Sequence, residues 1–486
     1  MKKWNLFSLA WPIFVETALF MLLGFIDVFV MSKYDDLAAS SVNTANQAIS
    51  IVTIVFSVIS GASAVLISQY LGAEKRESAS RIAALSIVFN LLTGIVISAA
   101  FLFFSDPILS FIGAEGTVMK FASQYLSIVG GCIFLQAHMS AVAVIVRNHG
   151  LTKVTMYISL GMNIVNAGFD MVLVLGLFGM PRMGVAGAAV ATMFSRIVGT
   201  VILTVYLFRK VEKPSVFRLL LPFPKKDFAD MLKIGIPSAM ESFLYNLSQL
   251  VITSMVLNYL TENELVTKTY VQNISMFFYI FAVAIGQASQ IITGHYVGAG
   301  QYDLAYKKGF SAYGKALAFA VLLSGTGILL RRQLMQIFTD NPQVITLGCN
   351  ILIFNILLEL GRTTNIVVIA NLRGAGDVYF PTVCAIFSMW VISVLGSYLL
   401  AVQMGLGIYG LWAAIAGDEV FRGILMVLRW KSGKWRSKSI IKNASSPPGE
   451  KVPGQCIFLI NSGLKQQNIQ EENAYECSSN NSSLKQ

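Results

Sequence analysis

The sequence has few charged residues, few histidines and no organised cysteines. Only 13% of its 486 residues are Asp, Glu, Lys or Arg, whereas a soluble domain carries about 25%. The three His and five Cys are scattered, without the spacing of a metal centre or a redox pair. No cluster of His, Asp or Ser gathers at one end of an apolar segment. These absences argue against an enzyme, soluble or membrane-embedded, and we expect no resident cofactor.

Long apolar segments fill the chain instead. Hydrophobic residues make up 55% of it, and runs of about 20 residues, enough to cross a hydrocarbon core about 30 Å thick, recur along its length. We therefore predict an all-α, polytopic membrane protein with twelve transmembrane helices. The first six are expected at residues 6–31, 44–72, 81–104, 121–146, 153–178 and 184–208, and the second six at 229–258, 268–297, 308–330, 343–372, 378–403 and 407–430.

Lys and Arg gather in the loops on one side of these helices. Lys75 and Arg76 follow the second helix, Arg147 the fourth and Arg373 the tenth. By the positive-inside rule this side is cytoplasmic, with both termini, and we expect a multi-pass protein of the cell membrane. The formal charge of +11 is explained by this topology, so no nucleic-acid partner is expected.

Two segments fall outside the predicted helices. Residues 209–228 are basic, contain Pro214, Pro222 and Pro224, and are expected to link two six-helix lobes, 1–208 and 229–431, on the cytoplasmic side. Residues 432–486 form the predicted cytoplasmic tail, which becomes rich in Pro, Ser, Asn, Gln and Glu. Such a composition is typical of disorder.

The two lobes repeat one another in sequence. A shift of about 225 residues aligns Pro12-x-x-x-Glu16 with Pro237-x-x-x-Glu241, and three further motifs follow in the same order. Because each lobe has an even number of helices, both have the same topology, so the repeat is parallel and its pseudo-two-fold axis runs along the membrane normal. Two such bundles can enclose a central cavity and expose it to each side in turn. The other motif pairs are residues 61–73 with 286–299, 147–150 with 373–376, and 184–187 with 407–410.

The first predicted helix carries two acidic residues, Glu16 and Asp27. On a helix they lie within roughly 20° of each other around the axis and about 16 Å apart along it. Carboxyls inside a membrane are costly, so they are expected to face protein or water and to mark an ion or substrate path. The alternative is a packing role, with each acid satisfied by neighbouring helices.

The fifth predicted helix carries Asn163, Asn166 and Asp170 on one face, at i, i+3 and i+7. Counted from the cytoplasmic end, Asp170 lies about 25 Å deep and Asp27 about 31 Å deep, so we expect the two to meet in the outer half of the first lobe. Two carboxylates with amide oxygens suit Na⁺, whereas a crowded carboxyl pair can hold a proton. Both ions are candidates, and the alternative is two acids bonded to hydroxyls.

The second half does not repeat this arrangement, because Ile252 and Gly396 stand where the shift places the partners of the two aspartates. It holds Glu241 and, in the tenth helix, Glu359 with Arg362 at i+3. That pair either serves a site or neutralises itself as a helix-surface salt bridge. Asp418 and Glu419 with Arg422 present the same two alternatives, a functional site or a salt bridge that neutralises itself. We predict that cation coupling is biased to the first lobe.

Several sequence motifs resemble those of a known protein family. The most specific is Leu-Arg-Gly-Ala-Gly-Asp at 372–377, at the end of the tenth helix. The others are Trp11-Pro12 with Asp27, residues 69–73 (Gln-Tyr-Leu-Gly-Ala), Asn166-x-x-x-Asp170, the Gly, Ala, Thr, Ser and Arg pattern of 184–196, and residues 410–412 (Gly-Leu-Trp). Together, over about residues 5–435, the chain resembles the multidrug and toxic compound extrusion (MATE) family of secondary transporters.

The resemblance implies a twelve-helix, V-shaped exporter that expels small organic compounds, often cationic or amphipathic, in exchange for Na⁺ or H⁺. It implies that Asp27, Asn166 and Asp170 form the cation site of the first lobe, holding Na⁺ if the protein is sodium-coupled, with Thr192 as the matching threonine of the sixth helix. It also implies that Glu241 corresponds to an acid of the seventh helix. We expect a monomer in the lipid bilayer whose partners are small organic substrates.

Two other transporter classes fit the sequence less well. A flippase for lipid-linked saccharides has a related fold and a more basic cavity, and the small number of Lys and Arg inside the predicted helices argues against it. A major-facilitator carrier also has six plus six helices, but its basic Gly-x-x-x-Asp-Arg signature is missing after the second helix, where residues 72–76 read Gly-Ala-Glu-Lys-Arg.

Overall fold

A computed structural model describes residues 5–32 and 34–441 of the chain. Within these ranges the chain forms helices and no strand, which confirms the predicted all-α class. The disorder predicted for the tail falls largely on residues 442–486, which lie outside the described residues.

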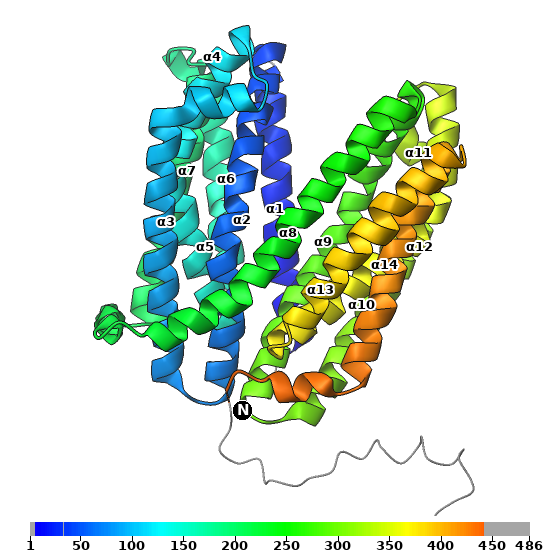
Figure 1. The fold of residues 1–486 in the computed structure, drawn as a ribbon. Coiled ribbons are helices and arrows are strands. Elements are labelled where there is room, and N and C mark those ends of the chain that lie inside the picture. The colour runs from blue at the N-terminus through cyan, green and yellow to red at the C-terminus, as the bar shows by residue number, and fades with distance from the viewer. Residues whose placement is uncertain (1–4, 33, 442–486) are drawn as a thin grey trace, which may run out of the picture. The chain divides into compact units, whose positions relative to one another are not determined.

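The first lobe contains six helical spans, the fourth of which is broken (Figure 1). The fourth span bends by 46° between residues 130 and 133, where a short π-helical stretch (η1) interrupts it. A 3₁₀ turn, η2 (Leu177–Gly179), precedes the sixth span. The spans are α1 (Leu6–Ser32), α2 (Asp36–Gly72), α3 (Arg76–Phe111), α4 (Gly116–Tyr125) with η1 (Leu126–Gly130) and α5 (Ile133–Asn148), α6 (Thr152–Leu175) and α7 (Val185–Lys210).

The second lobe repeats this order after a linker that contains a 3₁₀ helix, η3 (Pro214–Leu220). Its eleventh span continues from α13 through two π-helical stretches. The elements are α8 (Lys225–Tyr259), α9 (Glu262–Gly298), α10 (Tyr302–Leu329), α11 (Arg331–Gln336), α12 (Pro342–Gly374), α13 (Tyr379–Ser388) with η4 (Met389–Leu395) and η5 (Tyr398–Gln403), α14 (Gly407–Lys431) and η6 (Lys434–Lys438).

Among the described residues, nine helices are long and apolar enough to cross a membrane, or ten if the bent fourth span is counted. The two remaining spans, α8 and α14, are more polar. Asp418, Glu419 and Arg422 lie in the middle of α14, and Glu241 lies inside α8. These two helices match α1 and α7 in the repeat, so the arrangement agrees with the predicted twelve. These charged side chains line a cavity in the second lobe.

Equivalent residues start the second helix of each lobe. The side chain of Asp35 accepts hydrogen bonds from the backbone N–H groups of Leu37 and Ala38 and so caps α2. Thr261, its counterpart in the repeat, forms a capping box with Glu264 at the start of α9. Both caps satisfy N–H groups that a helix start leaves without partners.

The lobes meet through a reciprocal backbone contact. A Cβ at Gly72 would lie 2.1 Å from the carbonyl oxygen of His295, and a Cβ at Gly298 would lie 1.9 Å from that of Gln69. Gly72 matches Gly298 in the repeat and Gln69 matches His295, so each lobe presents the same surface to the other. This is the contact that the predicted pseudo-two-fold axis requires. Only glycine allows the two backbones to approach so closely.

The first helix of each lobe also packs against the other lobe near this contact. Ile13 of α1 belongs to a buried cluster with residues of α9, α10, α12 and α14, and the ring of Phe14 stacks on that of Phe281 at 3.9 Å between centroids. In return, Ile234 of α8 is buried among residues of α2, α3 and α5. The apolar core is therefore continuous between the lobes at this end.

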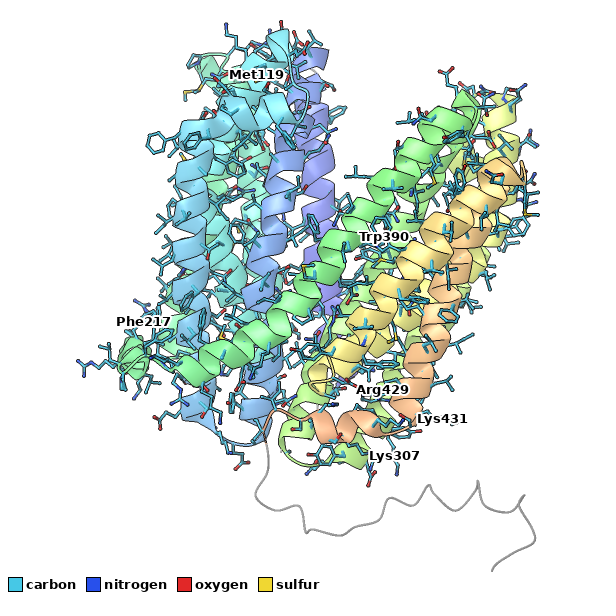
Figure 2. All side chains as sticks on the ribbon, in the orientation of Figure 1. Met119, Phe217, Lys307, Trp390, Arg429 and Lys431 are labelled. Carbon is cyan, nitrogen blue, oxygen red and sulfur yellow. The ribbon has the colours of Figure 1, made fainter. Side chains whose placement is uncertain are left out.

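We call this end of the molecule the basic end, because the connections at 73–75, 149–151, 211–224, 299–301 and 432–441 lie there and Lys and Arg residues lie in or beside them. Figure 2 shows Lys307, Arg429 and Lys431 at this end and Met119 at the opposite one. Large apolar side chains such as Phe103 are exposed along the helices between the two ends, as expected for a lipid-facing surface.

The structured chain extends beyond the boundary expected at 432. Trp435 in η6 is fully buried and stacks on Trp430 of α14, with 4.2 Å between ring centroids. The Ile440 N–H then donates to Gln69 Oε1 of α2 at 3.2 Å. The composition of this segment is polar, but the single buried indole holds it against the helices.

Candidate functional site

The polar residues predicted for the first lobe come from three helices. Asp27 lies near the end of α1, Asn166 and Asp170 lie one turn apart on α6, and Thr192 lies in α7. Asp170 is only 1% exposed, and Asn166 and Thr192 are also buried. The spacing of Asn166 and Asp170 turns both toward α1 and α7 because residues four apart share a helix face.

The side chain of Asn166 lies between the two carboxyls. With its amide nitrogen turned toward them, Nδ2 donates to Asp27 Oδ1 at 3.2 Å and to Asp170 Oδ2 at 3.1 Å, while Oδ1 accepts from the Thr192 backbone N–H at 3.2 Å. The reverse orientation leaves only a contact of 3.4 Å from Nδ2 to Thr192 Oγ1. The first orientation satisfies both ends of the amide, so it is the stable one in the absence of an ion.

The carboxyls of Asp27 and Asp170 are also hydrogen-bond partners of each other. An ionised carboxylate only accepts hydrogen bonds, so this contact needs one proton on the pair. Asp170 Oδ1 has no other donor within the described part of the chain. For two carboxyls in direct contact inside the lobe, ionisation of both is unfavourable without a cation between them, because their like charges repel. The pair can therefore bind either a proton or a small cation.

Two further residues of this site, Tyr125 and Arg196, were missed from the sequence. Tyr125, at the end of α4, is buried and hydrogen-bonds the hydroxyl of Thr192. The guanidinium of Arg196 on α7 lies within electrostatic range of Tyr125 and Asp27. Arg196 Nη1 is buried and has no hydrogen-bond partner among residues 5–32 and 34–441. Its position four residues after Thr192 was the available signal.

Two predicted residues lie apart from this pair. Asn163 Nδ2 donates to the Ser159 carbonyl oxygen within α6 at 2.7 Å. Glu16 is buried nearer the basic end, where Thr155 Oγ1 donates to Glu16 Oε2 at 2.8 Å and Ser159 Oγ to Oε1 at 3.5 Å. The two acids of α1 therefore serve different surroundings, as their separation along the helix requires.

In the second lobe Glu241 is bound by two residues. Arg373 Nη2 donates to Glu241 Oε2 at 2.7 Å, and Thr382 Oγ1 donates to the same oxygen at 3.1 Å. Thr382 is the counterpart of Thr155, so each lobe binds the glutamate of its first helix with a threonine from its fifth. Only the second lobe adds an arginine from its own helices.

Deeper in the second lobe, two arginines bind three acids. Arg362 Nη1 lies 2.9 Å from Glu359 Oε1. The i, i+3 salt bridge considered from the sequence is therefore present, but Glu359 is 1% exposed, so the pair is buried and does not lie on a surface. Arg422 Nη2 lies 3.1 Å from both Asp418 Oδ2 and Glu419 Oε1. These ion pairs are part of the interior of the lobe.

A cavity of about 690 Å³ lies beside these ion pairs. It is lined by one face each of α8, α9, η4, α12 and α14, and its charged lining residues are Glu241, Arg362, Arg373, Asp418, Glu419 and Arg422. Glu359 is not part of the lining. From the sequence we expected few basic residues inside the spans. The cluster of three arginines was not predicted, because they come from two helices that are separated by the eleventh span.

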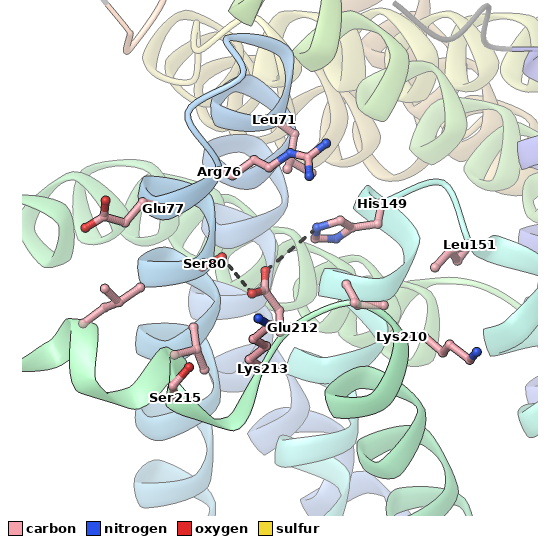
Figure 3. A pocket seen from close by; sticks show the side chains of 13 residues that line it. Leu71, Arg76, Glu77, Ser80, His149, Leu151, Lys210, Glu212, Lys213 and Ser215 are labelled. Atoms are coloured by element: carbon pink, nitrogen blue, oxygen red, sulfur yellow. Dashed lines mark hydrogen bonds and ion pairs between the residues drawn. The ribbon is translucent and has the colours of Figure 1, made fainter.

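A second cavity, of about 630 Å³, lies at the basic end of the first lobe (Figure 3). Its residues come from the junctions of α2 with α3 and of α5 with α6, and from the end of α7 with η3. Ser80 Oγ donates to Glu212 Oε2 at 2.7 Å, and His149 Nε2 lies 3.9 Å from Glu212 Oε1. This cavity lies in the loops outside the spans and is separate from both intramembrane clusters.

Comparison with known proteins agrees with this architecture. A family model described as MatE matches residues 12–172 and 237–399, one match in each lobe. The chain is 36% identical over 439 residues to the uncharacterized transporter YisQ of Bacillus subtilis, covering 90% of this chain and 96% of that protein. It is 28% identical to the probable multidrug resistance protein NorM of Thermotoga maritima, covering 90% and 94% of the two chains.

Solved structures show the same fold. A MATE protein crystallised in the bent conformation superposes with a TM-score of 0.80 at 18% identity, covering 88% of this chain and 95% of that one. A transporter of the MOP superfamily from Pyrococcus furiosus, described as having a binding pocket of reverse polarity, gives a TM-score of 0.81 at 18% identity over 89% and 96% of the chains. The twelve-helix arrangement in two lobes is thereby confirmed.

Proposed function

The chain belongs to the MatE family, whose members are transporters rather than enzymes, and from this premise we propose that it is a cation-coupled antiporter that exports small organic compounds. The relatives named as multidrug resistance proteins support the choice of cargo. The protein works in the cell membrane as a monomer, with the basic end in the cytoplasm.

The observation that carries the coupling proposal is the buried pair of Asp27 and Asp170, bridged by Asn166. We infer that the pair holds one proton when the Asn166 amide nitrogen faces it, because two adjacent ionised carboxylates would repel each other. Loss of that proton leaves two negative charges in a medium of low polarity, which is unfavourable unless a cation replaces it. Na⁺ binding requires the amide to turn so that its oxygen faces the ion. Asp27, Asn166 and Asp170 then act as ligands, and Thr192 and Tyr125 position them.

Exchange requires the two lobes to expose this region to each side in turn. The reciprocal contact of Gly72 and Gly298 closes the path at the basic end. Gln69 Nε2 donates to the Gly374 carbonyl oxygen at 2.8 Å across the same interface. Ion binding in the first lobe changes the stability of α1 against α6, and α1 also packs on the second lobe. That double contact offers a route from the ion site to the interface.

Replacing Asp170 with Asn tests the assignment. We expect Asp170→Asn to fold normally but to reduce gradient-driven export of a fluorescent organic cation about 100-fold, because the pair can no longer exchange a charge. The measurement is dye export from proteoliposomes with a Na⁺ or an H⁺ gradient imposed separately, which also identifies the coupling ion. Asp303→Asn is the matched control, since its exposed carboxyl pairs with Arg436 outside both intramembrane clusters. Wild-type export by Asp170→Asn under the effective gradient would refute the coupling site.

A further inference from the structure

We propose that the cavity of the second lobe binds the exported compound and selects a zwitterion, an organic molecule that carries both a carboxylate-like anion and a cationic nitrogen. The proposal rests on the proposed export function and adds a substrate class to it. Its support comes from the size of the cavity, the arrangement of its charges and the polar atoms in it that lack partners.

The cavity is of the right size and lining for a drug-sized molecule. Its volume of about 690 Å³ falls within the range of about 300–1,000 Å³ that is typical of small-molecule sites. Neutral polar side chains, among them Gln249, Gln272 and Gln290, stand beside Tyr245 and Trp412. Amides and aromatic rings of this kind orient a ligand without adding charge.

Its charges are mixed and balanced. Three arginines and three acids line it, at positions 362, 373 and 422, and 241, 418 and 419. A site for simple organic cations needs acids that no protein cation neutralises. A site for anions needs arginines that no protein acid neutralises. Here Arg373 is bonded to Glu241, Arg422 to both Asp418 and Glu419, and Arg362 to Glu359 behind the lining, so each charged group already has a partner of opposite sign and neither condition holds.

A zwitterion can enter such a cavity without leaving a charge uncompensated. Its anion takes the guanidinium of Arg422 or Arg373, and its cationic group takes the carboxylate that this arginine released. A monovalent cation that binds Glu241 displaces Arg373 and leaves that guanidinium unpaired, which is costly in a buried site. The exchange of partners therefore favours ligands that carry both charges over ligands that carry one.

Two polar atoms of residues that line the cavity lack partners, and a shift of their side chains toward the cavity would offer these atoms to such a ligand. Arg422 Nε and Asn365 Oδ1 are buried and have no hydrogen-bond partner within the described ranges of the chain. Arg422 and Asn365 are 6% and 3% exposed. Arg422 uses Nη2 for its two acids, so Nε is free to donate in a forked contact with an incoming carboxylate. Asn365 Oδ1 can accept from an ammonium group on the same molecule.

Two dyes that differ by one group provide the test. Rhodamine 110 carries a free carboxylate and a cationic ring system, and rhodamine 123 is its methyl ester and carries only the cation. We expect purified protein to bind rhodamine 110 about tenfold more tightly than rhodamine 123, measured by fluorescence anisotropy without any ion gradient. Equal binding, preference for rhodamine 123 or absence of rhodamine 110 binding overturns the proposal.

Variants of the arginines locate the effect. Arg422→Lys keeps one positive charge between the acids but loses the forked donor, so we expect it to abolish most of the tenfold preference for rhodamine 110 over rhodamine 123. Arg373→Gln serves as a second variant at the other end of the cavity. The control is Arg436→Gln, whose exposed ion pair with Asp303 lies outside the cavity. A preference that survives in both cavity variants refutes the assignment.

The binding assay distinguishes failure of the zwitterion proposal from failure of the proposed ion coupling. Binding is measured without a gradient, so it does not depend on the coupling site, whereas Asp170→Asn tests coupling without reference to charge selection. Farnesyl diphosphate, an anion with a lipid tail and no cationic group, serves as a competitor. If it displaces rhodamine 110 with higher affinity than rhodamine 110 itself binds, the cavity is an anion site of the kind that a lipid-linked saccharide flippase needs, and the zwitterion proposal fails.

Discussion

Arg196 of α7 and Arg422 of α14, which lie on the last helix of their respective lobes, have opposite surroundings. In the second lobe, Arg422 binds Asp418 and Glu419 through one nitrogen at 3.1 Å. In the first lobe, Arg196 lies near Asp27 without an ion pair shorter than 4.0 Å in the described residues, and its Nη1 has no partner there. Arg422 therefore neutralises the acids beside it. Arg196 does not, and in the first lobe the two aspartates contact each other.

This difference explains how a duplicated fold acquires two kinds of site. Acids that an arginine already neutralises gain little from a cation, because the cation must displace the arginine first. The pair formed by Asp27 and Asp170 has only the neutral amide of Asn166 between its carboxyls, so a proton or a cation completes it. Each lobe therefore carries an arginine on its last helix at a different position, and the two lobes differ in the acids around it.

Arg147 and Arg373, which do occupy equivalent positions in the repeat, also differ in their partners. Arg373 binds Glu241 within its own lobe at 2.7 Å. Arg147 forms no ion pair with Glu16 in the described structure, and its Nη1 donates to Gln287 of the other lobe at 3.2 Å. Glu16 is left with the hydroxyls of α6. One arginine of the repeat thus stabilises a lobe, and the other joins the lobes.

The largest effect is expected from removing Arg422. Arg422→Ala leaves two buried carboxylates without a cation, and breaking a buried ion pair in this way costs about 3–5 kcal/mol of unfolding free energy. Arg196→Ala removes no ion pair, and we expect it to cost under about 1 kcal/mol, mainly through lost packing. The thermal unfolding of both variants in detergent measures the contrast. Similar losses for the two arginines would mean that their surroundings do not differ in strength.

The sequence predicted the fold and the first-lobe pair for clear physical reasons. Apolar length set the spans, and counting residues along α1 and α6 brought Asp27 and Asp170 to similar depths. The second-lobe cavity was beyond such counting, because contacts such as Arg373 with Glu241 and Asn365 with Glu419 join helices far apart in the chain. No helical period predicts which distant side chain completes an ion pair.

A smaller effect is expected at the contact between the lobes. Gly72→Ala and Gly298→Ala each place a methyl group against a backbone carbonyl, and such overpacking costs about 1–3 kcal/mol. Because the contact is reciprocal, both variants should weaken it equally and move the basic ends of the lobes apart. Spin labels at Lys75→Cys and Lys307→Cys, read by pulsed electron spin resonance, measure that separation. Gly61→Ala is the control, since a Cβ there meets no atom within 4 Å in the described structure.

The smallest effect separates the two arginines of the second comparison. Arg147→Gln loses the hydrogen bond to Gln287 across the lobes, worth about 0.5–1.5 kcal/mol, so we expect the same spin labels to report a larger open fraction with an unchanged melting temperature. Arg373→Gln breaks the ion pair with Glu241 inside one lobe, so it should lower the melting temperature and leave the label distance unchanged. If both variants change the melting temperature, or both change the label distance, the two arginines have the same role. The idea that one stabilises a lobe and the other joins the lobes would then be refuted.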